Sequence, residues 1–125
     1  MNNFSQQQKK LLAGLFLISC LPFASSKAAT HPQQEQADVV INQLYHSLNK
    51  LPKSDMSARM DIISAKFIGK KYRLGALGEG IDAHYDQRPQ YRADAFDCDT
   101  YVTTVLALAL ADNTNGFKQC LRKVR

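Results

Sequence analysis

Cys98 is the residue of this sequence best placed to act as a nucleophile. It follows Asp97 and opens a strongly apolar run, so we expect it in the first turn of a helix. The unpaired N–H groups and positive dipole end of a helix N-terminus stabilise a thiolate, the reactive form of cysteine. Asp97 suits the capping position, but Asp97 and Asp99 also place negative charge beside the sulfur. Position alone leaves two interpretations open, a nucleophile and a buried structural cysteine.

Three histidines could serve such a nucleophile as a base, and all of them precede Cys98 in the sequence. His31 and His46 are expected at the surface, in a linker and in a first helix. His84 falls in a long loop that could bring it toward the cysteine. A complete cysteine–histidine pair is therefore not evident from the sequence.

Metal and disulfide chemistry find little support. No Cys-x-x-Cys or His-Glu-x-x-His pattern occurs, and Asp94, Asp97 and Asp99 lack the glycine and terminal glutamate of a calcium loop. We therefore expect neither a metal site nor a cofactor. A disulfide between Cys98 and Cys120 is chemically permitted in an oxidising compartment.

Residues 98–111 are expected to form a helix that is buried on all sides, because their apolar side chains cover almost every face. The run is much too short to cross a bilayer. Residues 112–116 are predicted to break it, and helical spacing resumes at Phe117. Basic residues of this last helix are expected to form a solvated face: Lys118, Arg122, Lys123 and Arg125.

Two amphipathic helices are predicted upstream. Apolar spacing indicates the first over residues 35–51, ended by Pro52. Ser54 or Asp55 can cap the second. Residues 69–97, rich in glycine and tyrosine, are predicted to form a long ordered loop with a short strand near Tyr72. The apolar face of the second helix is expected to consist of Met56, Met60, Ile63 and Phe67.

Residues 1–28 are organised like a secretory signal peptide. Two lysines precede an apolar run over residues 11–23, and small residues at 26 and 28 fit a cleavage site. We expect a periplasmic or secreted chain with no membrane span after cleavage, a linker over residues 29–34 and one domain over 35–125. The residues before Cys20 also fit a lipoprotein signal, in which this cysteine would carry a lipid anchor.

Composition excludes several classes of protein. The 125 residues are 45% hydrophobic and 22% charged, unlike disordered, collagen-like or many-span membrane proteins. The net charge is +5, but three lysines lie in residues 1–28 without any acid there. The remaining 13 basic and 11 acidic residues leave only +2, so no nucleic-acid partner is predicted.

Two motifs resemble a known family. FDCDTYV at residues 96–102 resembles the nucleophile motif of the NlpC/P60 superfamily, the papain-like cell-wall amidases and endopeptidases of bacteria. It is closer to the DUF1460 branch, the N-acetylmuramoyl-L-alanine amidase-like proteins, whose motif runs Asp-Cys-Thr-Thr-Phe-Val. GKKYRLG at residues 69–75 is similar to a Gly-x-Pro-Tyr-x-x-Gly element that lines the active-site cleft of that family. The resemblance covers residues 55–125.

The resemblance implies a mainly α chain that forms the N-terminal helical half of an α+β papain-like domain, with the C-terminal sheet missing. Cys98 would be the catalytic nucleophile, Tyr72 and Asp97 would contact substrate, and the substrate would be peptidoglycan or its peptide fragments. Lys71 and Asp99 depart from the family pattern. The family's histidine follows its cysteine, so this chain is expected to be truncated and inactive as an enzyme.

Two other interpretations stay open. A small exported helical binding or adaptor protein would use Cys98 as a structural residue. A truncated or frameshifted gene product would have no activity of its own. The rate at which a thiol reagent modifies Cys98 distinguishes a nucleophile from a buried structural cysteine.

Overall fold

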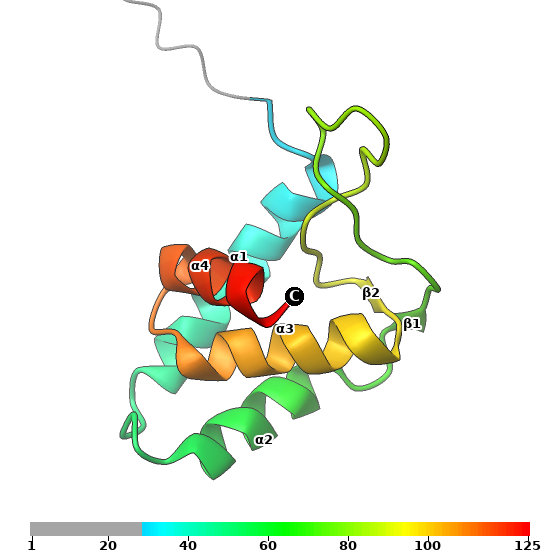
Figure 1. The fold of residues 1–125 in the computed structure, drawn as a ribbon. Coiled ribbons are helices and arrows are strands. Elements are labelled where there is room, and N and C mark those ends of the chain that lie inside the picture. Colours follow the sequence, from blue (N-terminus) through cyan, green and yellow to red (C-terminus); the bar gives the residue numbers. More distant parts are fainter. Residues whose placement is uncertain (1–28) are drawn as a thin grey trace, which may run out of the picture.

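The computed structural model describes residues 29–125, so the predicted signal peptide and Cys20 lie outside the described residues. Within this range the chain is mainly helical, as predicted, and α3 lies between α2 and α4 (Figure 1). No helix in residues 29–125 combines the length and the apolar character needed to cross a membrane. In chain order the elements are α1 (Pro32–Leu48), α2 (Met56–Phe67), β1 (Lys71–Tyr72), β2 (Ala95–Phe96), α3 (Cys98–Leu110) and α4 (Thr114–Val124).

Helix α1 begins and ends earlier than its apolar spacing predicts. His31 is its N-cap, and the Nδ1 atom of this histidine accepts a hydrogen bond from the N–H of Gln33 at 3.4 Å. Pro32 suits the first helical position, because its fixed φ is helical and it has no N–H to satisfy. The last three residues of the predicted linker are therefore helical, and the helix ends at Leu48.

Helix α2 begins after Asp55, one of the two predicted N-caps, but it buries an unexpected residue. Met60 is exposed, whereas Arg59 is only 2% exposed. The Arg59 guanidinium donates to the carbonyls of Ala109 at 3.0 Å and Ala111 at 2.6 Å, at the end of α3. A third, longer bond of 3.4 Å reaches the carbonyl of Leu48 at the end of α1. One cation thus joins the C-terminal ends of two helices to α2.

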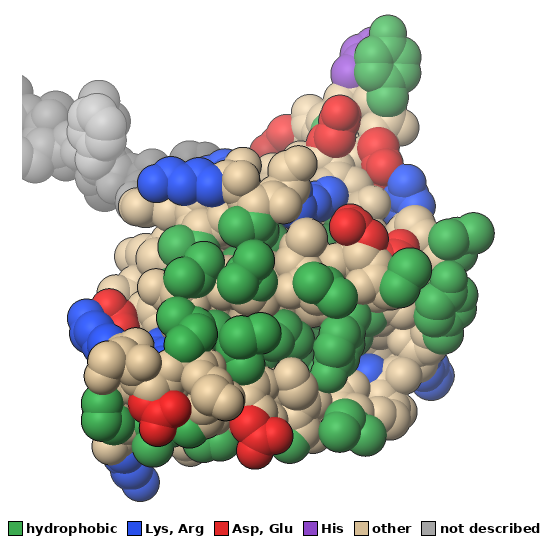
Figure 2. Space-filling model, turned by 60° about the horizontal axis from the view of Figure 1, so that its bottom comes forward, with side chains coloured by type: hydrophobic (Ala, Val, Ile, Leu, Met, Phe, Trp, Pro, Cys, Tyr) green, Lys and Arg blue, Asp and Glu red, His purple; other side chains and the backbone are tan. Residues whose placement is uncertain are grey.

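Helix α3 starts at Cys98 as predicted, but the expectation that it is buried on all sides is wrong. Val102 and Leu110 are 61% and 51% exposed, and Leu106 between them is half-buried. These residues repeat every four positions and so lie on one face of the helix. Figure 2, which brings the lower side of Figure 1 forward, shows hydrophobic side chains gathered across this side of the molecule. Only the opposite face of α3 belongs to the core.

Truncation of a leucine is expected to cost far more stability on the buried face of α3 than on the exposed face. Leu108 is fully buried, so Leu108→Ala should lower the free energy of unfolding by about 2–5 kcal/mol. The matched variant Leu110→Ala removes the same atoms from the exposed face and should cost about 0.5 kcal/mol or less. Urea unfolding followed by circular dichroism measures both variants. Equal losses would contradict the one-sided burial.

Helix α4 begins inside the segment that was predicted to break the helix. Asn113 is its N-cap, and the Asn113 side chain accepts from the N–H of Gly116 at 2.9 Å. The break is therefore confined to residues 111–113, between the end of α3 and Thr114. The residue types that interrupt a helix, such as Asn and Asp, also serve as N-caps, so the sequence alone does not separate a break from the start of α4.

Candidate functional site

Two short strands bring the predicted site residues close to one another. Strands β1 and β2 pair in parallel, with Tyr72 beside Phe96, and the N–H of Arg73 donates to the Phe96 carbonyl at 2.9 Å. The predicted strand near Tyr72 is confirmed, whereas β2 was not foreseen. Residues 71–73 thus run alongside the residues that lead directly into Cys98.

Asp97 caps α3 through a reciprocal pair of hydrogen bonds. Its Oδ1 atom accepts from the N–H of Thr100 at 2.8 Å, and the Thr100 Oγ1 atom accepts from the N–H of Asp97 at 2.9 Å. Chiefly the N–H and then the hydroxyl of Thr100 lower the pKa of Asp97. The predicted cap is confirmed, and it fixes where the helix starts.

The second carboxylate oxygen of Asp97 holds the loop after β1. It accepts from the N–H of Gly75 at 3.0 Å, and the Arg88 guanidinium donates to the Gly75 carbonyl. Gly75 has φ of +61°, and a Cβ atom there would lie 2.6 Å from the Arg88 side chain. The positive φ favours glycine, and any larger residue would also displace the end of the Arg88 side chain. Asp97 therefore links the loop that follows Tyr72 to the start of α3.

Arg92 and Asp94 form a further support that the sequence analysis missed. The Arg92 side chain is only 6% exposed, and it donates to both carboxylate oxygens of Asp94, at 2.6 and 2.8 Å. This pairing lowers the pKa of Asp94. Arg92 also reaches the carbonyl of Ala76 at 3.5 Å. An Arg-x-Asp spacing has no distinctive periodicity, so only the fold reveals the role of this pair.

The Cys98 thiol is exposed, which contradicts the interpretation of Cys98 as a buried structural residue. Within residues 29–125 it has no hydrogen-bond partner. Cys120 is half-buried, and both cysteines are free, so the disulfide between them is absent. Asp97 takes the N–H groups of Thr100 and Tyr101, which leaves those of Cys98 and Asp99 at the open end of the helix.

Aromatic side chains pack the start of α3 against α2. The Phe96 ring lies 5.1 Å from that of Phe67 and 5.8 Å from that of Tyr101, centroid to centroid. The Tyr101 hydroxyl donates to the carbonyl of Ser64 at 3.2 Å. Residues on both sides of Cys98 are thus packed against α2, which positions the exposed thiol on a rigid support.

The other predicted site residues are distributed differently. Tyr72 is 71% exposed, and a cleft shared by Tyr72 and Cys98 stays a prediction. His31 caps α1, His46 lies in its last turn, and His84 stacks edge-on against Tyr85 at 4.4 Å in the loop. In the described part of the chain none of these histidines forms a hydrogen bond with Cys98, and no group of His, Cys, Asp and Glu side chains there could hold a metal ion.

The stability that the Asp97 side chain contributes should depend on pH. Asp97→Ala is expected to lower the free energy of unfolding by about 1–2 kcal/mol near pH 7, as loss of an N-cap does. The folded-state pKa is below the ordinary 3.8, so this stabilisation is present above pH 4 and lost as the pH falls through the lowered value. Urea unfolding between pH 7 and pH 3 should show the difference from wild type shrinking. Asp99→Ala is the matched control. A loss of stability in Asp97→Ala that is the same at every pH would contradict the claim that the ionised carboxylate of Asp97 provides the stabilisation.

Comparison with known proteins places these features in a family. The family model described as AmiA-like, N-acetylmuramoyl-L-alanine amidase-like, matches residues 62–125, just over half of the chain. The matched segment contains Tyr72, Asp97 and Cys98. A search of curated proteins finds no match.

A solved structure is similar over a longer stretch. The crystal structure of protein LPG0564 from Legionella pneumophila str. Philadelphia 1, which carries the family model DUF1460, is 54% identical, with a TM-score of 0.67. The similarity covers 72% of this chain but only 29% of that one, so this chain spans less than a third of its solved relative. On the match over residues 62–125, the chain belongs to the N-acetylmuramoyl-L-alanine amidase-like family.

Proposed function

We propose that Cys98 is the nucleophile of an amidase-like cysteine hydrolase that acts on an amide or peptide bond in peptidoglycan. One observation carries the proposal: an exposed, unpartnered cysteine occupies the first position of α3, inside the segment that matches the amidase-like family. A helix N-terminus presents N–H groups that can bind an anion, and the packing of Phe96 and Tyr101 fixes the start of α3.

The chemistry follows from this placement. The Cys98 thiolate attacks the carbonyl carbon, and the oxyanion that forms accepts hydrogen bonds from the N–H groups of Cys98 and Asp99. The carbon–nitrogen bond then breaks, and the amine leaves with a proton from a general acid. Water hydrolyses the thioester that remains, which regenerates the thiol.

The general acid is the part of this chemistry that residues 29–125 do not supply at Cys98. The resemblance to the NlpC/P60 superfamily puts a histidine on a β-sheet that packs against the nucleophile helix. On this proposal the four helices correspond to the helical half of a papain-like α+β fold.

Tyr72 and Asp97 have separate roles in the proposed enzyme. Tyr72 is exposed beside the residues that lead into α3, so its ring can contact a substrate bound at Cys98. Both carboxylate oxygens of Asp97 are engaged by the protein itself, at Thr100 and Gly75. Asp97 therefore acts on substrate through the loop that it positions.

Export belongs to the same proposal. Peptidoglycan lies outside the cytoplasm, and residues 1–28 have the lysines, apolar run and small residues of a secretory signal. The mature chain then works in the periplasm or outside the cell, either free after cleavage near residue 28 or attached through a lipid at Cys20. Mass spectrometry of the exported chain distinguishes these two N-termini.

The rate of thiol alkylation tests the nucleophile directly. Iodoacetamide is expected to modify Cys98 at pH 6–7 several-fold faster than an equally exposed cysteine away from a helix start. Peptide mapping by mass spectrometry counts each cysteine separately, so Cys20 and Cys120 do not confuse the result. Denaturant should abolish the difference, because it removes the helix.

A cysteine one turn along the same helix is the matched control. In the variant Cys98→Ser/Val102→Cys, the introduced thiol is exposed on α3 but lies beyond its free N–H groups. Its alkylation rate should equal that of a small free thiol with the same fraction of thiolate at that pH. If Cys98 in the wild-type chain reacts no faster than this control, the nucleophile assignment is wrong.

A further inference from the structure

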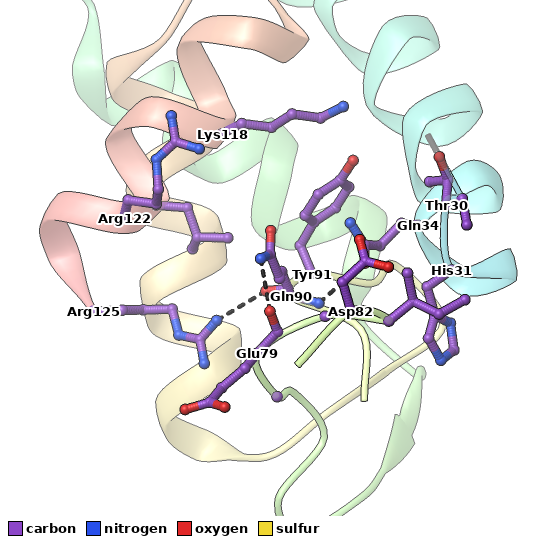
Figure 3. A pocket seen from close by; sticks show the side chains of 15 residues that line it. Thr30, His31, Gln34, Glu79, Asp82, Gln90, Tyr91, Lys118, Arg122 and Arg125 are labelled. Atoms are coloured by element: carbon purple, nitrogen blue, oxygen red, sulfur yellow. Dashed lines mark hydrogen bonds between the residues drawn. The ribbon is translucent and has the colours of Figure 1, made fainter. Parts of the chain in front are cut away.

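The structure has a concave site that Cys98 does not line. An open cavity of about 630 Å³ is bounded by the start of α1, the loop around residues 78–82 and 90–91, and α4 (Figure 3). Neither Tyr72, Asp97 nor Cys98 lines it. Its volume falls in the range of pockets that hold small molecules.

Helix α4 supplies a basic wall to this cavity. Lys118, Arg122 and Arg125 follow one another at spacings of four and three residues, so they lie on one face of the helix. The expectation that this face is merely solvated is wrong for Lys118. Its ammonium lies 3.0 Å from Asp38 and 5.2 Å from the centre of the Tyr91 ring.

The basic wall is firmly anchored. The Tyr91 hydroxyl donates to the other oxygen of Asp38 at 2.8 Å, and the Tyr91 ring packs edge-on against Phe117 at 5.5 Å. Phe117 and Leu121 are buried in the core. The cationic side chains of α4 thus project from a helix whose apolar side chains are fixed in the core.

The loop supplies an acidic wall that is also held in place. Glu79 and Asp82 line the cavity, and the Gln90 side chain donates to the Glu79 carbonyl at 2.8 Å. The N–H of Gly80 donates to the Arg88 carbonyl at 2.9 Å. Gly80 has φ of +105°, a conformation that other residues rarely adopt. Hydrogen bonds therefore fix the loop that carries the two carboxylates.

The cationic and anionic side chains that line this cavity do not form ion pairs with one another. Asp38 already pairs with Lys118, and Arg125 donates to the uncharged carbonyl of Gln90 at 2.9 Å. Arg122 has no partner in the described part of the chain, and no ion pair there joins Glu79 or Asp82 to a cation within 4 Å. Two guanidinium groups and two carboxylates therefore line one space without pairing.

We propose that this cavity binds a small zwitterion of the amino-acid or short-peptide class. The ligand's carboxylate would bind Arg122 and Arg125, because a guanidinium group matches a carboxylate in charge and shape. Its ammonium group would bind Glu79 and Asp82. An anion alone would face the repulsion of the two carboxylates, and a cation alone would face the two guanidinium groups. This binding does not depend on Cys98 or on the proposed hydrolysis.

Titration of the full, ¹⁵N-labelled chain with L-alanyl-L-alanine tests the proposal. Amide signals of residues that line the cavity should shift and saturate, with a Kd in the millimolar range because the charges face open water. N-acetylation of the dipeptide removes its ammonium group and C-terminal amidation removes its carboxylate. Each change should weaken binding about three- to tenfold, and added salt should weaken binding of the unmodified dipeptide.

Arg122→Gln and Lys123→Gln form a matched pair for the same titration. Both remove one positive charge from α4, but only Arg122 lines the cavity. Arg122→Gln should weaken binding of the free dipeptide and leave binding of the amidated dipeptide unchanged, whereas Lys123→Gln should alter neither. Unchanged amide spectra elsewhere confirm that the variants are folded. The proposal is overturned if wild-type shifts do not saturate, if the blocked dipeptides bind as well as the free one, or if the two variants behave alike.

Discussion

Arg59→Met is expected to lower the free energy of unfolding by about 2–5 kcal/mol, a large part of the stability of a domain of this size. Arg59 is almost completely buried and has no carboxylate partner within hydrogen-bond distance in the described residues. Its partners are backbone carbonyls at the C-terminal ends of α1 and α3, where the aligned peptide dipoles leave partial negative charge.

The loss arises from the carbonyls that remain. Methionine fills much of the volume of arginine but donates no hydrogen bond, so the carbonyls of Ala109 and Ala111 would stay buried without this donor. The Leu48 carbonyl keeps the hydrogen bond that it accepts from the N–H of Leu51 at 3.0 Å. Each buried polar group left without a partner costs about 1–3 kcal/mol. The contact that joins α1, α2 and α3 would also disappear, so the ends of two helices should fray together.

Two variants sharpen this measurement. Arg59→Lys keeps the charge but presents a single ammonium group, so its loss should fall between those of wild type and Arg59→Met. Lys66→Met makes the same type of change at an exposed position of α2 and should cost about 0.5 kcal/mol or less. Urea unfolding of the full chain measures all three. A loss for Arg59→Met no larger than that for Lys66→Met would refute the bridging role.

The 125-residue chain alone is expected to release no amine from peptidoglycan in a Cys98-dependent way. Turnover needs a proton donor for the leaving amine, and loss of a positioned acid–base group costs about 10²–10⁴-fold in rate. Asp97 has a lowered pKa and is ionised near pH 7, so it cannot donate. Within residues 29–125, none of His31, His46 and His84 forms a hydrogen bond with Cys98.

The assay compares new amines released by the wild-type chain with those released by Cys98→Ala. We expect the two rates to be equal, even though Cys98 reacts readily with iodoacetamide. His84→Ala is the informative second variant, because His84 lies in the long loop that, on the sequence, could bring it toward Cys98. Turnover that disappears in both Cys98→Ala and His84→Ala would refute the expectation and identify His84 as the base.

Local signals predicted most of the secondary structure. Asp55 and Asp97 cap α2 and α3 where the sequence places them, because an N-cap depends on a side chain and the N–H groups two or three residues later. The same local rule explains the errors at α1 and α4. His31 and Asn113 act as caps although neither was recognised as one, so both helices begin earlier than apolar spacing indicated.

The candidate nucleophile could also be found from sequence. Its position depends on the cap at Asp97 and on the apolar residues that follow, and both are adjacent to Cys98 in the chain. The strand β2 could not be found in this way, because two residues cannot show an alternating pattern. The sequence also does not determine whether Cys98 is exposed, because that depends on how α3 packs against α2 and α4.

Tertiary structure alone decided the features that join distant residues. Arg59 is separated by 50 residues from Ala109, and Lys118 by 80 from Asp38, so no local pattern connects either pair. The apolar residues of α3 cover most faces of the helix, and only the positions of α2 and α4 determine which face is buried. Helix propensity and capping act over a few residues, whereas burial and charge pairing depend on which surfaces the fold brings together.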